Sequence, residues 1–265
     1  MRRSLSRLYW LPCSLALLLP CSTVWARYEA TLVKEYTGPH QDAFITQFDR
    51  VRLLVRQAQV EDSALLGLFQ YREGFQYPLF IHFEDGAPAG AENALAYVRL
   101  GQTSQGFAQE LVVNLAADAG AGMDFDRIFY HEMTHAVMND AVGSEASLKI
   151  PHWVQEGLAQ YVSGEGKNRV TQAAGQFKKS QVKALLYNLE GPYTGAAYPQ
   201  YYLAIECLYE KHSVNAVQAL VRDLIQGKST TDSIEDVTGL SWDKFQEEVR
   251  DYSLKSLQDK ARPDY

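Results

Sequence analysis

The spacing of apolar and polar residues predicts short strands in the first half of the chain. Apolar residues alternate with polar ones in YEATLVKEY (28–36), and the apolar run YPLFIHF (77–83) is typical of a buried strand. ELVVNLA (110–116) fits a further strand, whereas ALAYVRL (94–100) fits a strand or a short helix equally well. The intervening GQTSQGFAQ (101–109) is rich in turn-forming residues.

Helical spacing begins near Asp42 and dominates beyond residue 150. A helix from Asp42 would carry on one side the apolar residues Phe44, Phe48, Val51, Leu54 and Val55. A mostly buried helix with Asp124 and Asp126 in its first turn follows the strands, because carboxylates suit the positive end of a helix dipole. Four more helices are expected at 151–162, 201–212, 215–227 and 241–257. The order of elements predicts an α+β fold, with a small mixed sheet, one helix packed on it and a mainly helical C-terminal lobe.

The first 26 residues have the pattern of a secretory signal peptide. MRRSLSR is basic, LYWLPCSLALLLP is apolar, and the segment ends in Val-Trp-Ala, with small residues where signal peptidase cleaves. We therefore predict a signal peptide at 1–26 and one domain at 27–265, with an uncleaved membrane anchor as the alternative. A lipoprotein is disfavoured because Pro20 precedes Cys21. No later stretch is apolar over enough residues to form a transmembrane helix.

The charge and cysteine content of the chain limit its possible partners and its possible cellular location. Cleavage after residue 26 removes three arginines and no acidic residue, so the formal net charge moves from −7 to −10. Such an acidic protein does not suit nucleic acid. Cys207 is the single cysteine of the expected mature chain, which therefore has no internal disulfide. An exported protein without disulfides fits a bacterial periplasm.

HEMTH (131–135) places two histidines one turn apart on a helix. Residues four apart share a helix face, so the imidazoles of His131 and His135 can bind one Zn²⁺. Glu132 is one position further on and leans over the open side of the metal, where a carboxylate can take a proton from water. The alternative is an ordinary buried helix whose histidines bond to backbone or to neighbouring side chains, and the motif alone does not separate the two.

A catalytic zinc needs a third protein ligand, with the fourth position left for water. An extended motif with glycine at 138 and histidine at 141 does not apply, because the chain has Met138 and Ala141 there. Glu156 in WVQEGLA is the other option. Twenty residues separate it from His135, which is enough for a loop and a second helix packed beside the first. His152 is interpreted as surface or cleft wall rather than as a ligand.

Several residues near the motif have supporting or structural interpretations. Gln160 is one turn after Glu156 and could bond the outer nitrogen of a histidine ligand, with a surface glutamine as the alternative. Asp140, at the end of the motif helix, is a second candidate for this role. Trp153 is expected to pack in the core. Three further histidines show no ligand spacing and are interpreted as structural: His40, His82 and His212.

HEMTHAV followed by PHWVQEGLAQYV resembles the glutamate-ligand zincins, the gluzincins. The likeness is greatest to the bacterial peptidase MA-like family, in which H-E-x-x-H is followed by P-x-W-x-x-E-G-x-A. The resemblance implies a zincin-like fold and Glu132 as general base. It also implies Zn²⁺ bound by His131, His135 and Glu156.

The resemblance extends more loosely over most of 27–265. YPLFIHF resembles a strand of the family's sheet. ELVVNLA resembles the edge strand before the zinc helix, which would offer its free edge to an extended peptide. YPQYYLAIECLYEKH (198–212) resembles the helix after the ligand glutamate, which begins with a tyrosine in the family. Tyr198 is therefore the candidate hydrogen-bond donor to the oxyanion. Packing is the alternative for it and for its neighbours Tyr193, Tyr201 and Tyr202.

Together these features predict an exported zinc-dependent metallopeptidase with a peptide or protein substrate. Zn²⁺ would polarise the scissile carbonyl, while Glu132 takes a proton from water and later gives it to the leaving amine. One alternative is a zinc aminopeptidase, for which Glu92 in GAEN (90–93) would bind the substrate amine, although GAEN lacks the central residue of that motif. The other is a non-catalytic zinc-containing protein of the cell envelope that binds a partner.

Overall fold

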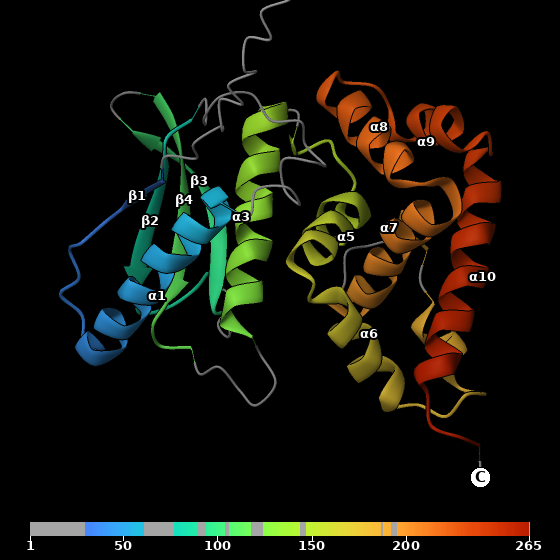
Figure 1. The fold of residues 1–265 in the computed structure, drawn as a ribbon, viewed down its shortest axis with the longest axis horizontal. Coiled ribbons are helices and arrows are strands. Elements are labelled where there is room, and N and C mark those ends of the chain that lie inside the picture. The colour runs from blue at the N-terminus through green and yellow to red at the C-terminus, as the bar shows by residue number, and fades with distance from the viewer. Residues whose placement is uncertain are drawn as a thin grey trace, which may run out of the picture.

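The computed structural model describes residues 30–60, 77–88, 94–103, 106–117, 124–143, 147–186, 188–191 and 195–264. The signal peptide predicted for 1–26 lies outside these residues. The described chain forms a sheet lobe and a helical lobe side by side, with helix α3 (Phe125–Val142) of the first facing helix α5 (His152–Ser163) of the second (Figure 1). None of the helices in this part of the chain is long and apolar enough to cross a membrane.

Within the described residues, four strands form the sheet, and their order is β1-β2-β4-β3. They are β1 (Ala30–Leu32), β2 (Leu79–Glu84), β3 (Ala96–Thr103) and β4 (Gly106–Asn114). β2 runs parallel to β1 and to β4, and β3 runs antiparallel to β4, so the sheet is mixed. In β2 the alternate side chains Leu79, Ile81 and Phe83 are buried. The predicted α+β class with a small mixed sheet is confirmed, and 96–100 belong to a strand, β3.

The prediction that 110–116 forms the edge of the sheet is wrong. β4 lies between β2 and β3 and pairs with both, so the edge strands of the described sheet are β1 and β3. Thr103 pairs with Gly106, so only two residues separate the paired ends of these strands. A hairpin this tight places β3 directly beside β4. The turn-rich composition of 101–109 hides the hairpin, because most of these residues continue the two strands.

Helices α1 (Gln41–Val60) and α3 pack against the same face of the sheet (Figure 1). Asp124 caps α3, since its side chain accepts a hydrogen bond of 3.1 Å from the backbone nitrogen of Asp126. Asp126 in turn forms an ion pair of 2.6 Å with Arg50 of α1. The shared core of helices and sheet includes Val51, Leu54, Leu79, Ile81, Leu111, Phe129 and Met133.

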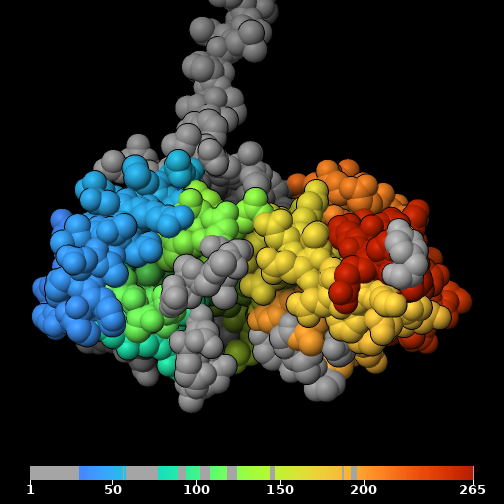
Figure 2. All heavy atoms as spheres, turned by 90° about the horizontal axis from the view of Figure 1, so that it is seen from below, coloured from blue at the N-terminus to red at the C-terminus, as the bar shows by residue number. Residues whose placement is uncertain are grey.

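The helical lobe is built around α7 (Tyr198–His212), most of which is buried. Around it lie α5, α6 (Gly166–Gly175), α8 (Val214–Ile225), α9 (Thr230–Thr238) and α10 (Trp242–Lys260), with 3₁₀ turns at Val182–Leu185 and Gly195–Ala197. On the surface, atoms of α3 (green) meet those of α5 and α6 (yellow) in the middle of the molecule (Figure 2). The sequence did not predict α6 or α9, because both have few large apolar residues and depend on packing against their neighbours.

Helix α5 is anchored in the core of the helical lobe. Trp153 is fully buried, and its ring lies 6.0 Å from those of Trp242 and Phe245, which confirms its packing role. Gly157 allows α5 to approach α7 closely, because a Cβ there would lie 2.4 Å from the backbone oxygen of Tyr201. The backbone next to Glu156 is therefore fixed against the centre of the lobe.

The close approach of α5 to α7 predicts the effect of adding one methyl group. Gly157→Ala should destabilise the protein by about 1–3 kcal/mol, the usual cost of overpacking, because the Tyr201 oxygen belongs to the backbone. Urea unfolding measures this change. Gly175→Ala, at the end of α6, is the control, since nothing lies within 4 Å of its Cβ. An equal free energy of unfolding for the two variants would contradict the packing described here.

Candidate metal centre

Three side chains from α3 and α5 converge on one point. Nε2 of His131 lies 3.0 Å from Nε2 of His135 and 3.3 Å from Oε2 of Glu156. Nε2 of His135 lies 3.6 Å from Oε1 of Glu156. Ligand atoms bound tetrahedrally at the usual zinc distances lie roughly 3.3 Å from one another. The spacing therefore fits a single ion, and these three residues are the group within the described chain that could hold one.

Helix geometry explains this convergence. His131 and His135 are one turn apart on α3, and their rings meet at 72° with centroids 4.8 Å apart. Glu156 comes from α5, which packs against α3. Gln155 secures the start of α5, because its side-chain nitrogen donates to the backbone oxygens of Ser147 at 3.0 Å and Ile150 at 2.7 Å. The structure thus brings together the three residues that the sequence predicted as ligands.

Burial of the three groups changes their protonation. Burial opposes a charge on His131, but the carboxylates of Glu156 and Glu165 outweigh it and raise the pKa of the imidazole to about 10. For His135, burial dominates and lowers the pKa to about 4. Burial also opposes ionisation of Glu156, yet the two imidazoles outweigh burial and lower the pKa of its carboxyl. Protonated His131 therefore balances the carboxylates, and a metal ion at its Nε2 must displace that proton.

Glu132 lies beside the ligand group and is held by the sheet. Its Oε2 accepts a hydrogen bond of 3.1 Å from the backbone nitrogen of Val98 in the edge strand β3. Burial of the carboxyl is the largest influence on its pKa, which is raised to about 7. A carboxyl group with this pKa can accept and release a proton near neutral pH.

Sequence reasoning missed Glu165, which contacts the outer nitrogen of His131. Oε1 of Glu165 lies 2.6 Å from Nδ1 of His131 and 3.2 Å from Nε of Arg169. Burial opposes ionisation of Glu165, but the contacts with His131 and Arg169 outweigh it and lower the pKa of the carboxyl. Glu165 has no fixed spacing from the H-E-x-x-H motif. The one local signal is its place between two glycines in SGEG (163–166).

The two residues predicted to support the histidines both bond to backbone groups. Gln160 is fully buried, and its Nε2 donates to the backbone oxygen of Glu156 at 3.1 Å, not to a histidine. Asp140 is buried near the end of α3 and accepts a hydrogen bond of 2.7 Å from the backbone nitrogen of Tyr77. A residue four positions after the ligand glutamate shares its helix face. The side chain of Gln160, however, forms its hydrogen bond with a backbone carbonyl of its own helix.

Tyr198 begins α7 and is partly buried. The guanidinium of Arg169 lies 5.3 Å from the centre of its ring, and Arg169 also contacts Glu165. Tyr198 is thus linked through Arg169 and Glu165 to the ligand group. Its role at the oxyanion stays a prediction.

The other tyrosines of this region divide into two groups. Tyr201 and Tyr202 are buried, and Tyr202 donates a hydrogen bond of 2.5 Å to Glu206, so both pack within the helical lobe. Tyr193 lies outside the described residues, as does Glu92, on which the aminopeptidase alternative depends.

The remaining histidines are outside the ligand group. His152 is exposed at the start of α5, one turn before Glu156, as expected for a residue on the surface or on a cleft wall. Three others lie near carboxylates elsewhere: His40 at 2.7 Å from Asp85, His82 at 3.9 Å from Glu110, and His212 at 2.6 Å from Glu248.

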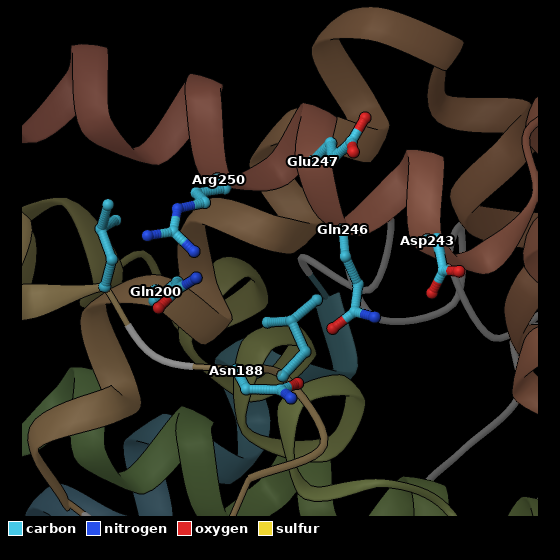
Figure 3. Close-up of a pocket in the computed structure, with 8 residues that line it drawn as sticks. Asn188, Gln200, Asp243, Gln246, Glu247 and Arg250 are labelled. Carbon is cyan, nitrogen blue, oxygen red and sulfur yellow. The ribbon is translucent and has the colours of Figure 1, made fainter.

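A cavity of about 240 Å³ lies in the helical lobe, between α7, α10 and the residues Leu186, Asn188 and Leu189. Gln246 points from α10 toward Asn188, and Gln200 and Arg250 also line the space (Figure 3). None of the three converging ligands lines it. This cavity is therefore separate from the metal centre.

Comparisons of the chain with protein-family models, with curated proteins and with solved structures found no match. The resemblance to gluzincins thus stays a prediction from the two sequence motifs. The convergence of His131, His135 and Glu156 is an independent observation, because it depends on how α3 and α5 pack.

Removal of any one ligand should abolish tight metal binding. His131→Ala, His135→Ala and Glu156→Ala should each lower the zinc content of the purified protein at least about tenfold, because two remaining ligands hold zinc weakly. Elemental analysis after dialysis against dilute zinc gives the number of ions per chain. His152→Ala is the matched control on α5 and should retain one ion. Full zinc in Glu156→Ala with loss in His152→Ala would show that the third ligand is His152.

Metal affinity should rise with pH. The pKa of His131 is raised to about 10 in the metal-free centre, so His131 is protonated throughout the range from pH 6 to pH 8. Zinc at its Nε2 releases that proton, and affinity should therefore increase about tenfold per pH unit. Chelator competition at several pH values measures the slope, and calorimetry in two buffers counts the protons released. An affinity independent of pH would contradict a protonated His131.

Proposed function

We propose that this chain is an exported zinc-dependent metallopeptidase with a zincin-like fold. The observation that carries the proposal is the convergence of two imidazole nitrogens and one carboxylate oxygen, with Glu132 beside them. Two histidines and one glutamate are the donor set of a class of catalytic zinc sites that keep their fourth position for water. Bound zinc would acidify that water and polarise the scissile carbonyl.

Glu132 is suited to act as the general base. It is the residue after the first ligand, so its carboxyl lies beside the ligand group without belonging to it. Its raised pKa of about 7 allows it to take a proton from the attacking water and to give it to the leaving amine. The water oxygen then bonds to the carbonyl carbon, and the C–N bond breaks. The backbone nitrogen of Val98 orients the carboxyl during these transfers.

The edge strand β3 is placed to bind an extended peptide. The backbone oxygen of Leu95 accepts a hydrogen bond from β4, whereas the backbone nitrogen of Val98 points to Glu132. Because backbone groups alternate along a strand, those of Ala96, Val98 and Leu100 point to the outer edge. A peptide added along this edge would pass beside Glu132. The edge predicted for 110–116 is thus replaced by β3, which supports a peptide or protein as the substrate.

The signal-like pattern of residues 1–26 supports export. The single cysteine of 27–265, which leaves no internal disulfide, supports a bacterial periplasm as the destination. Comparison of the N-terminus of the protein recovered from the cell envelope with that of the encoded chain tests this part of the proposal separately.

Glu132→Gln tests the catalytic role. Glutamine keeps the size of the side chain and can still accept the hydrogen bond from Val98, but it is not a base. Hydrolysis of a broad peptide library should fall at least about a hundredfold, while zinc content stays close to that of the wild type. Glu235→Gln, an exposed glutamate on α9, is the control with the same change of charge and should leave the rate unaltered.

Two outcomes would contradict the proposal. If peptide hydrolysis survives Glu132→Gln, Glu132 is not the base. A wild type that binds zinc but cleaves no peptide in the library would favour the non-catalytic binding protein.

A further inference from the structure

The turn SGEG (163–166) between α5 and α6 has a defined shape. Gly164 ends α5 with φ +71°, a left-handed conformation that side chains rarely adopt, and its backbone oxygen accepts a hydrogen bond of 2.9 Å from Arg127 of α3. Gly166 packs against the ring of Tyr202, where an added Cβ would lie 2.0 Å from Cδ2. The turn is therefore held by α3 on one side and by α7 on the other. Glu165 lies between these two fixed glycines.

The carboxylate of Glu165 is buried and faces α3. Its Oε1 lies 2.6 Å from Nδ1 of His131, a close contact in which neither atom meets the angles of a regular hydrogen bond. Arg169, one turn further along α6, contacts both oxygens, with Nε 3.2 Å from Oε1 and Nη2 3.3 Å from Oε2. The guanidinium also lies over the ring of Tyr198. Arg169 thus contacts the same carboxylate that contacts His131.

An imidazole that binds a metal through Nε2 must carry its proton on Nδ1. An acceptor at Nδ1 fixes this tautomer and the orientation of the ring. Gln160, the position from which the sequence predicted such support, bonds to the backbone of its own helix. Glu165 is the carboxylate in contact with the outer nitrogen of His131.

We propose that Glu165 is the positioning residue for His131 and that Arg169 holds its carboxylate in place. The inference rests on the metal site in the proposed function, but not on the reaction. The two glycines of the SGEG turn then have a functional role, because they allow the turn that places Glu165 beside His131. Loss of such an outer partner typically weakens metal binding about 10–100-fold.

Zinc affinity measured by chelator competition tests this role without depending on catalysis. Glu165→Gln keeps an acceptor oxygen but loses the charge, and it should weaken zinc binding about tenfold. Glu165→Leu removes the acceptor and should weaken it about a hundredfold. Glu235→Gln carries the same charge change on an exposed part of α9 and should bind zinc as the wild type does. Unfolding of each metal-free variant, followed by circular dichroism, establishes that the proteins are folded.

Two further measurements separate positioning from a merely structural role. With saturating Co²⁺, the visible absorption bands should shift in Glu165→Gln, because the ring of His131 is no longer held, and should not shift in Glu235→Gln. If Arg169 acts through Glu165, then Arg169→Gln should weaken zinc binding in the wild type and have little further effect in the Glu165→Leu background.

The outcomes distinguish this inference from the function on which it rests. If the wild type binds zinc tightly and both Glu165 variants bind it equally well, with unchanged Co²⁺ spectra, Glu165 has no positioning role, and the metal site stands. A wild type that binds no zinc would overturn the metal site and this inference together.

Discussion

The crowding of donor atoms between α3 and α5 is the constraint on which this structure depends. The two imidazole nitrogens lie 3.0 Å apart, and they lie 3.3 and 3.6 Å from the two different carboxylate oxygens of Glu156. Such an arrangement costs free energy unless a proton or a metal cation lies among the donors. Hydrophobic packing must supply that free energy. α3 is fixed by the core of the sheet lobe, and α5 by Trp153 and by the close approach of Gly157 to α7.

Each lobe adds one contact from outside the two ligand helices, and each contact involves a glutamate carboxylate. The edge strand β3 holds Glu132 through the backbone nitrogen of Val98. The turn after α5 brings Glu165 to the outer nitrogen of His131. A chemical centre built in this way requires both lobes to be folded, since neither lobe contains all of its parts. The proposed base and the proposed positioning residue therefore approach the ligands from different directions.

The sequence predicts those parts of the site that depend on local periodicity. His131 and His135 follow from helix phase, and Glu156 follows from the distance along the chain that a loop and a second helix require. Glu165 does not follow, because its place depends on a left-handed turn at Gly164 and on packing of Gly166 against Tyr202. The order of β3 and β4 was missed for a similar reason. A hairpin is closed by pairing between strands, and the composition of 101–109 masks it. α6 and α9 have little apolar periodicity of their own and are helical through their contacts in the lobe.

The proposed metal centre requires one ion bound among three residues. Anomalous diffraction at the zinc edge, from crystals of the zinc-loaded protein, tests this most directly. We expect a single strong peak about 2.0–2.2 Å from Nε2 of His131, Nε2 of His135 and a carboxylate oxygen of Glu156. A peak that lacks Glu156 among its ligands, or zinc bound only elsewhere on the molecule, would contradict it.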